Sequence, residues 1–222
     1  MIIANPAAAG KCFFHRCDPV RSASVAFWNP VATSIMYDFA VEFPRGLKYD
    51  EFLARHGTDE HRRRWNSVFD RIQLTANQRE LLSGFVRPMK VICLAGAWCG
   101  DCVNQCPIFE RFAQTSPKID TRYFDRDAHP DLQATLRICG GNRIPMLVFM
   151  SEDDQFLGLY GDRTLAKYQQ MAVDQLGPAC PTGITPPHQA LLDATTREWL
   201  IEFERIQLML RLSSRLRQKH SD

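Results

Sequence analysis

The sequence predicts an α/β protein with a small mixed central sheet that is covered by helices. Between residues 89 and 176, short apolar segments of strand length alternate with segments whose apolar residues recur at helical spacing. Such alternation is typical of a sheet with helices packed on both faces. A polar turn at residues 152–154 separates the last two strand segments. Because so short a connection joins antiparallel neighbours, we expect the sheet to be mixed.

Before the sheet, the sequence indicates a helical extension over residues 36–88 that packs on the core. Its first part, residues 36–49, is expected to be extended, and Tyr49–His56 suits a short helix. Thr58 is a favoured N-cap residue followed by acidic residues, so we expect a second helix to begin there. A capping-box pattern at residues 75–78 predicts the start of a third helix.

The central segment, residues 89–176, supplies the sheet. Its first strand is a buried apolar run that ends at Gly96, and a helix follows the two cysteines after it. Pro130 suits the first turn of the next helix. We expect strands at residues 89–96, 119–124, 145–150 and 155–160, and a last helix at residues 163–176.

Residues 177–188 contain several prolines, and we expect them to form a stiff connector. The segment 189–222 predicts one C-terminal helix, from near Ala190 to Gln218. Such a helix is stabilised by burying its apolar side, and we expect it to dock on the domain. The alternative is a homodimer in which the helix pairs with a second copy. The apolar stripe comprises Leu192, Trp199, Phe203, Ile206 and Leu210.

The composition argues against two classes of partner. The 27 basic and 25 acidic residues give a net charge of +2, which offers no electrostatic basis for binding nucleic acid. No apolar run reaches the length of a membrane span. Eight cysteines in 222 residues are few for a disulfide scaffold, so we expect a reducing compartment, the cytoplasm.

Residues 1–35 show no secretory signal, and we expect them to form a disordered extension. The alternatives are a transit peptide and sequence upstream of a start at Met36.

The chemistry is expected at Cys99 and Cys102, which lie where the first strand gives way to a helix. The free N–H groups and the dipole of a helix N-terminus favour a thiolate over a thiol at the first cysteine. The second sulfur lies one turn further on, close enough to form a disulfide with the first. This arrangement suits dithiol–disulfide exchange.

Further positions make this segment resemble the thioredoxin family. The run Trp98-Cys99-Gly100-Asp101-Cys102 resembles the family's active-site motif. Its residues are most similar to those of an uncharacterised bacterial branch of thioredoxin-like proteins. The resemblance implies a thioredoxin-like fold over residues 89–176. Outside the motif, the matching positions are Pro107 in the helix, Asp127 and Pro130 in a turn, Ile144-Pro145 at the cis-proline site and Gly161 after the last strand.

The resemblance also implies a function, that of a thiol–disulfide oxidoreductase that reduces protein disulfides. Cys99 would attack the substrate disulfide, and Cys102 would resolve the mixed disulfide. No cofactor or metal is needed, and a thioredoxin-reductase-like protein or a small thiol would supply the electrons. The alternatives are a glutathione- or peroxide-linked thiol reductase and a thioredoxin-fold interaction module whose dithiol is vestigial or regulatory. The residues expected to bind substrate are Trp98, Gly100, Asp101, Ile144 and Pro145.

Three positions depart from the thioredoxin pattern. Cys93 stands where thioredoxins carry a buried Asp that helps to move a proton, and Tyr123 stands nearest to the position of its Lys partner. Asp101 replaces a Pro between the cysteines, and its carboxylate should disfavour a nearby thiolate and make the pair more reducing. Cys106 is expected to be buried beneath the sheet, since no His lies at ligand spacing to build a metal site with it. For Cys139, a passive thiol and an accessory redox role remain the alternatives.

Overall fold

The structure, a computed structural model, describes residues 37–176 and 188–222. The extension expected over residues 1–35 lies outside the described residues, and so do all but the last residue of the connector expected over residues 177–188. In the described ranges, none of the helices combines the length and the apolar character that crossing a membrane requires.

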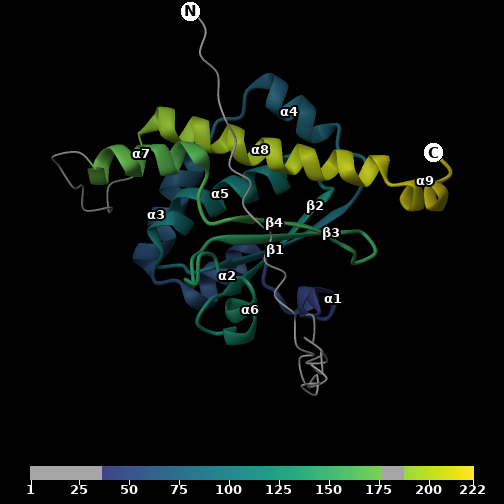
Figure 1. The fold of residues 1–222 in the computed structure, drawn as a ribbon. Coiled ribbons are helices and arrows are strands. Elements are labelled where there is room, and N and C mark those ends of the chain that lie inside the picture. The colour runs from purple at the N-terminus through teal and green to yellow at the C-terminus, as the bar shows by residue number, and fades with distance from the viewer. Residues whose placement is uncertain (1–36, 177–187) are drawn as a thin grey trace, which may run out of the picture. The chain divides into compact units, whose positions relative to one another are not determined.

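The centre of the fold is a four-stranded sheet in the order β2-β1-β3-β4 (Figure 1). β1 pairs in parallel with β2 and antiparallel with β3, and β3 pairs antiparallel with β4. The expected mixed sheet is therefore confirmed, and each strand begins within one residue of its expected start. The strands are β1 (Met89–Ala95), β2 (Ile119–Asp125), β3 (Met146–Ser151) and β4 (Phe156–Gly161).

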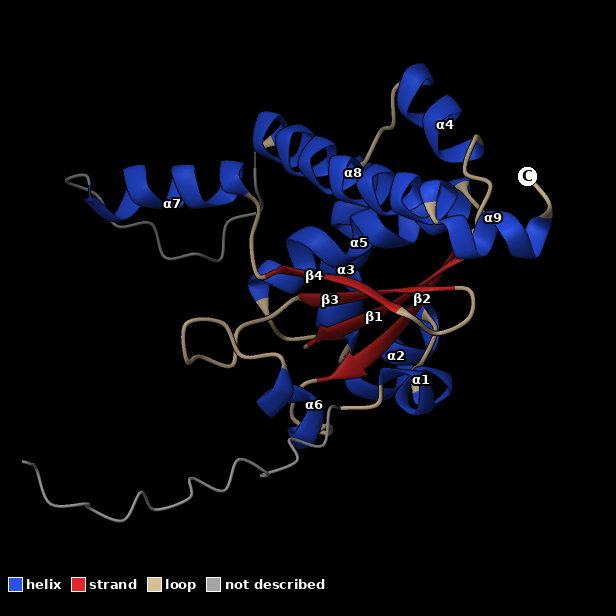
Figure 2. Ribbon diagram, turned by 45° about the vertical axis from the view of Figure 1, so that its right-hand side comes forward, coloured by secondary structure: helices blue, strands red, loops and turns tan. Residues whose placement is uncertain are grey.

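Helices cover both faces of this sheet. Every residue of β3 is buried. In β1, every residue is buried except Lys90, which is half-buried. Strands buried on both faces have continuous apolar sequences instead of alternating ones, which explains the runs seen in the sequence. In Figures 1 and 2, α5 (Gly100–Thr115) and α8 (Gln189–Leu212) lie on one face of the sheet, and α1 (Phe39–Glu42), α2 (Tyr49–His56) and α6 (Pro130–Thr135) lie on the other.

The start of the described chain differs from the expectation. Residues 36–49 do not form an extended segment, because α1 and a 3-10 turn at Phe43–Arg45 occupy most of it. The Asp38 carboxylate caps α1 by accepting hydrogen bonds from the backbone N–H groups of Ala40 (3.0 Å) and Val41 (3.2 Å). This local cap stabilises a helical turn that is too short to show a periodic pattern.

The next three helices are those that the sequence predicted, and the last two begin at the predicted capping residues. After α2, the helix α3 (Asp59–Arg71) begins at Thr58, whose hydroxyl accepts a hydrogen bond from the backbone N–H of His61. The helix α4 (Ala76–Ser83) begins at Thr75, which forms a reciprocal capping box with Gln78. α3 packs against α5, and α4 contacts both α5 and α8. The helical region before β1 is thus in contact with the helices that cover the sheet.

The C-terminal segment forms two helices, α8 and α9 (Ser214–His220), so the expectation of one continuous helix is wrong. The break falls at Ser213, whose backbone is extended (ψ 114°) and whose hydroxyl accepts a hydrogen bond from the N–H of Leu216. A serine in this position offers the backbone an alternative to continuing the helix. The chain therefore ends α8 and starts α9 at the same residue.

The apolar stripe of α8 docks on the domain, as expected. Trp199 and Phe203 are fully buried against α5, with ring centroids 4.6 Å from Phe109 and 5.3 Å from Phe112, respectively. Trp199 also donates a hydrogen bond from Nε1 to Oε1 of Gln105 (2.9 Å). The stripe is thus occupied within the chain, and a homodimer through this helix stays an untested prediction.

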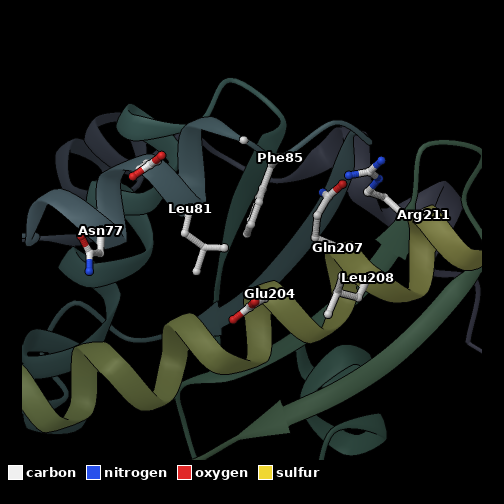
Figure 3. A pocket seen from close by; sticks show the side chains of 9 residues that line it. Asn77, Leu81, Phe85, Glu204, Gln207, Leu208 and Arg211 are labelled. Atoms are coloured by element: carbon white, nitrogen blue, oxygen red, sulfur yellow. The ribbon is translucent and has the colours of Figure 1, made fainter.

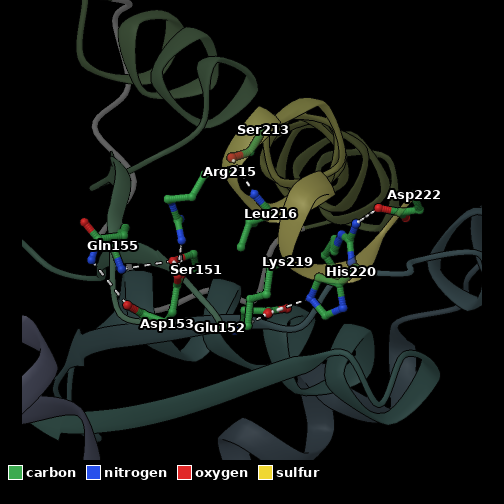
Figure 4. Close-up of polar contacts among 11 residues, drawn as sticks. Ser151, Glu152, Asp153, Gln155, Ser213, Arg215, Leu216, Lys219, His220 and Asp222 are labelled. Atoms are coloured by element: carbon green, nitrogen blue, oxygen red, sulfur yellow. Dashed lines mark hydrogen bonds and ion pairs between the residues drawn. The ribbon is translucent and has the colours of Figure 1, made fainter.

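Ion pairs hold α9 against the turn between β3 and β4 (Figure 4). Lys219 Nζ and His220 Nε2 lie 2.8 Å and 2.7 Å from Oε1 of Glu152. Arg215 pairs with Asp153 in the same turn. The end of the chain is therefore fastened to the sheet by charge as well as by apolar packing.

A groove of about 370 Å³ lies between α4 and α8 (Figure 3). Leu81 and Phe85 line it from the side of α4, and Leu208 lines it from α8. Gln207, which also lines it, is engaged with the backbone N–H and carbonyl groups of Arg87. The residues that line the groove include none of the expected site residues, so the groove is separate from the cysteines.

Candidate functional site

The site is built where the chain leaves β1 and passes through residues 96–98 before α5 begins. The buried Trp65 of α3 donates a hydrogen bond from Nε1 to the carbonyl oxygen of Ala97 (2.9 Å), which fixes this loop against α3. A Cβ atom at Gly96 would come within 3.0 Å of the Trp98 ring. The loop therefore has little freedom, and it holds the next residue at a defined position.

That residue, Cys99, is the N-cap of α5, and Cys102 lies in the first turn of the helix. The Cys99 carbonyl accepts a hydrogen bond from the N–H of Val103 (2.9 Å). Cys99 is partly exposed, whereas Cys102 is fully buried. Both are free thiols, as are the other cysteines of the described ranges. While both thiols are free, only the sulfur of Cys99 is accessible to another molecule.

The two thiols also differ in acidity. Burial raises the pKa of Cys102, but hydrogen bonds with the thiols of Cys106 and Cys99 outweigh it and lower that pKa to about 6. The hydrogen bond with Cys102, together with burial, raises the pKa of Cys99. The helix N-terminus alone predicts the thiolate at Cys99. The lowered pKa falls instead on Cys102, because the neighbouring thiols of Cys106 and Cys99 favour its charged form.

The Ile144–Pro145 loop faces the first sulfur. The Ile144–Pro145 peptide bond is cis, and the Ile144 carbonyl oxygen lies 3.9 Å from Sγ of Cys99. Gly161 at the end of β4 supports the loop, because a Cβ atom there would come within 2.5 Å of the Pro145 carbonyl oxygen. Its φ of 155° also lies in a region that side chains disfavour. The fold thus brings together positions that are far apart in the sequence.

Comparison of the sequence with protein families agrees with this arrangement, since the profile of a family described as thioredoxin matches residues 46–176. The protein belongs to the thioredoxin family. The match begins at residue 46, well before the expected domain start at residue 89, so it includes the helices α2, α3 and α4.

Two solved structures show the same thioredoxin-like fold. A protein of unknown function from Pseudomonas aeruginosa is 17% identical with a TM-score of 0.59, and the match covers 77% of this chain and 97% of that one. An HIV epitope scaffold is 18% identical with a TM-score of 0.55, and the match covers 75% of this chain and 99% of the scaffold. No protein of curated function matches this chain.

Beside the thioredoxin dithiol lies a cleft of about 670 Å³. Trp98 is 44% exposed there, and the guanidinium of Arg126 lies 4.6 Å from its ring centroid. Gly100 is the first residue of α5, and Pro145 directly precedes β3. All the expected site residues therefore lie at one end of the sheet. Those that line the cleft are Trp98, Cys99, Asp101 and Ile144.

An arginine that the sequence did not reveal also borders the site. Asp101 pairs with Arg163 at 2.5 Å, and Arg163 pairs with the buried Asp162 at 2.9 Å. Arg143 reaches Asp162 as well, at 3.3 Å. Asp162 directly follows Gly161, so its place near the site could have been found from the family motif. The partner of Asp101 could not, because it depends on how the chain turns after β4.

Behind the dithiol lie two further thiols. Cys93 and Cys106 are fully buried with their sulfur atoms 3.9 Å apart, so the expected burial of Cys106 is confirmed. Tyr123 is the β2 neighbour of Cys93, and its hydroxyl donates a hydrogen bond to the Cys106 carbonyl (3.3 Å). Cys139 is exposed in the loop before Ile144. Across the described residues, no group of three or more His, Cys, Asp or Glu side chains could hold a metal ion.

Proposed function

We propose that this protein is a thiol–disulfide oxidoreductase that reduces protein disulfides. The observation that carries the proposal is a partly exposed Cys99 beside a fully buried Cys102, opposite the Ile144 carbonyl. The exposed sulfur of Cys99 can reach a substrate disulfide, whereas the buried sulfur of Cys102 can react only with the sulfur of Cys99. An attacking and a resolving cysteine require this asymmetry.

In the first step, Cys99 attacks the substrate disulfide. Its proton passes to the neighbouring Cys102 thiolate, since Cys102 is the thiol with the lowered pKa. A bond forms between the Cys99 sulfur and one substrate sulfur, the substrate S–S bond breaks, and the other substrate sulfur leaves as a thiolate. Since Cys102 takes the proton, this step needs no base from outside the dithiol.

In the second step, Cys102 gives up its proton to water or to the departing thiolate, which its lowered pKa favours. The Cys102 thiolate attacks the Cys99 sulfur, and the bond between Cys99 and the substrate breaks. The substrate leaves with both of its sulfurs reduced, and a Cys99–Cys102 disulfide remains. One electron pair has then passed from the protein to the substrate.

The surface around Cys99 would bind the substrate, through Trp98, Gly100, Asp101, Ile144 and Pro145. The exposed Trp98 ring offers apolar contact area. The Ile144 carbonyl oxygen, 3.9 Å from the attacking sulfur, can accept a hydrogen bond from the backbone of an extended peptide. The reaction needs no bound cofactor. A thioredoxin-reductase-like protein or a small thiol would return the electrons, in the cytoplasm.

Reduction of insulin disulfides, with a chemical dithiol to recycle the protein, tests this function. Wild type should accelerate the reaction, and Cys99→Ser should abolish the acceleration. Cys102→Ser should accumulate mixed disulfides with substrate, because nothing resolves them. The matched control is Cys139→Ser, which removes an exposed thiol outside the dithiol and should retain activity.

If wild type is as inactive as Cys99→Ser, the proposal fails. Retained capture of a partner by both proteins would then favour the interaction module. Activity that appears only with glutathione would favour the small-thiol reductase.

A further inference from the structure

Asp162 directly follows β4 and lines the cleft beside Cys99, and the proposed exchange gives it no role. The residue is only 1% exposed. Its carboxylate accepts hydrogen bonds from the Tyr168 hydroxyl, from Nη1 of Arg163 (2.9 Å) and from Nη1 of Arg143 (3.3 Å). A buried charge is stable only when it is paired and hydrogen-bonded, so these three donors account for the burial of this carboxylate.

The Asp162 carboxyl is ionised at neutral pH. Burial alone would raise its pKa, but the hydrogen bond from Tyr168 and the charge of Arg163 outweigh burial and hold that pKa below the ordinary value of 3.8. The two ion pairs with the arginines are therefore present under the conditions in which the protein would work.

One of these ion pairs holds the loop that faces the attacking sulfur. Arg143 directly precedes Ile144, whose carbonyl oxygen lies 3.9 Å from Sγ of Cys99. The guanidinium of Arg143 also lies 3.4 Å from the Tyr168 hydroxyl, which itself donates to Asp162. The position of the Ile144–Pro145 loop therefore depends on the contact between Arg143 and the Asp162 carboxylate.

The other ion pair leads to the helix that carries the dithiol. Arg163 pairs through Nη1 with Asp162 and through Nη2 with Asp101, at 2.9 Å and 2.5 Å. Asp101 lies in the first turn of α5, two residues after Cys99. The backbone carbonyl of Asp162 also accepts a hydrogen bond from Nε2 of Gln105 in the same helix (2.9 Å). Asp162 is thus joined both to α5 and to the loop opposite it.

We propose that Asp162 is a positioning residue that fixes the Ile144–Pro145 loop relative to Cys99, and that this spacing favours disulfides carried by an extended polypeptide over small disulfides. This inference rests on the proposed function. A polypeptide must meet the Cys99 sulfur and the Ile144 carbonyl oxygen at the same time, so it depends on the spacing between them. A small disulfide without a peptide backbone needs only the sulfur.

The test compares the rate constants for reduction of two disulfides by the reduced full chain in a single turnover. Insulin presents its disulfides within a polypeptide, and bis(2-hydroxyethyl) disulfide has no peptide backbone. The readout is the ratio of the two rate constants, insulin over the small disulfide. A general loss of folded protein lowers both rate constants alike and leaves the ratio unchanged.

Asp162→Asn keeps the size of the side chain and removes the charge that holds both arginines. The ratio should fall by about fivefold or more, because a small misplacement of a binding group costs a large factor in rate. The matched control is Asp153→Asn, which removes a carboxylate that pairs with Arg215 in the turn between β3 and β4. Asp153 does not line the cleft, so this control should leave the ratio unchanged.

A double variant separates positioning from direct binding of substrate by Arg143. Arg143→Gln should also lower the ratio, because it removes the partner of Asp162 on the loop. If both changes break the same contact, the double variant should be little worse than Asp162→Asn alone. Effects that multiply fully would overturn the proposal, since Arg143 would then act independently of Asp162.

An unchanged ratio in Asp162→Asn, with wild type active on insulin, would also overturn this proposal and leave the proposed function intact. If wild type reduces insulin no faster than Cys99→Ser does, the proposed function fails and this proposal with it.

Should Asp162→Asn not fold, Arg143→Gln and Tyr168→Phe provide a second test that leaves Asp162 in place. Tyr168 belongs to α7 (Leu165–Leu176), and both side chains contact the same carboxylate. A ratio that falls in Arg143→Gln and falls little further when Tyr168→Phe is added supports the proposal. An unchanged ratio in Arg143→Gln, or effects of the two changes that multiply fully, would overturn it.

Discussion

At the scale of single residues, the charges beside the dithiol determine how reducing it is. The Asp101 carboxylate is one of the smaller causes that raise the pKa of Cys99, after the hydrogen bond with Cys102 and burial. Arg163 lies 2.5 Å from that carboxylate and offsets part of its effect. A charge that disfavours the thiolate disfavours the dithiol relative to the disulfide. The Asp101–Arg163 pair should therefore tune the redox potential.

Two variants of this pair should have opposite effects. Asp101→Asn removes the repulsive charge and should make the dithiol less reducing. Arg163→Gln leaves the carboxylate unpaired and should make the dithiol more reducing. Each shift should be on the order of tens of millivolts, since about 30 mV corresponds to about 1.4 kcal/mol for a two-electron couple. Equilibration with glutathione measures both potentials, and shifts of the same sign would contradict the charge argument.

Gly161→Ala should distort the loop that faces Cys99. The added Cβ would come within 2.5 Å of the Pro145 carbonyl oxygen, at a φ of 155°. We expect a loss of about 1–3 kcal/mol in the free energy of unfolding, measured in urea, and a lower rate of disulfide reduction. The control Gly141→Ala meets nothing closer than 3.5 Å and should change stability by less than about 0.5 kcal/mol. Equal effects at both glycines would contradict this view of the loop.

At the scale of elements, the docking of α8 contributes to the core that supports the site. Phe203 is fully buried and packs against Phe112 of α5 and Phe149 of β3. Phe203→Ala should lower the free energy of unfolding by about 3–5 kcal/mol because it leaves a cavity. Ile201→Ala on the same helix truncates a side chain that is 55% exposed and should cost less than about 0.5 kcal/mol. Urea denaturation of the pair checks this, and a small loss at Phe203 would show that α8 is not part of the cooperative core.

The attachment of α9 should depend on pH. The hydrogen bond from Lys219, opposed by burial and supported by His220, lowers the pKa of Glu152 below its ordinary value of 4.5. The ion pairs therefore stabilise the fold above that value, and their contribution is lost as the pH falls through the lower folded pKa. Glu152→Gln should be less stable than wild type at neutral pH and equally stable in strong acid. Thermal unfolding across this range tests the expectation, and a difference that does not change with pH would refute it.

At the scale of the whole molecule, the sequence predicted what depends on local signals. The buried run of β1 and the Thr58 and Thr75 caps lie in the sequence itself, so the strands and the helices α3 and α4 could be placed. The short turn α1 and the break at Ser213 could not, because single capping hydrogen bonds decide them. Each of these hydrogen bonds sets the backbone conformation of only a few residues, and so short a stretch shows no periodic pattern in the sequence.

The candidate site was partly predictable for a similar reason. Cys99, Cys102, the Ile144–Pro145 loop and Gly161 stand in the order of the thioredoxin motif, so their meeting could be expected. Which sulfur is the more acidic could not be predicted, because the pKa of Cys102 depends on neighbouring thiols in a fully buried setting. The charge partner of Asp101 likewise exists only once the chain has turned after β4.

The most direct test of the account is the location of the disulfide after one turnover. The reduced protein is mixed with an equimolar disulfide substrate, free thiols are blocked, and the linked peptides are identified by mass spectrometry. The account predicts a Cys99–Cys102 link together with a reduced substrate. Recovery of Cys99 and Cys102 as blocked free thiols, with the substrate still oxidised, would contradict it.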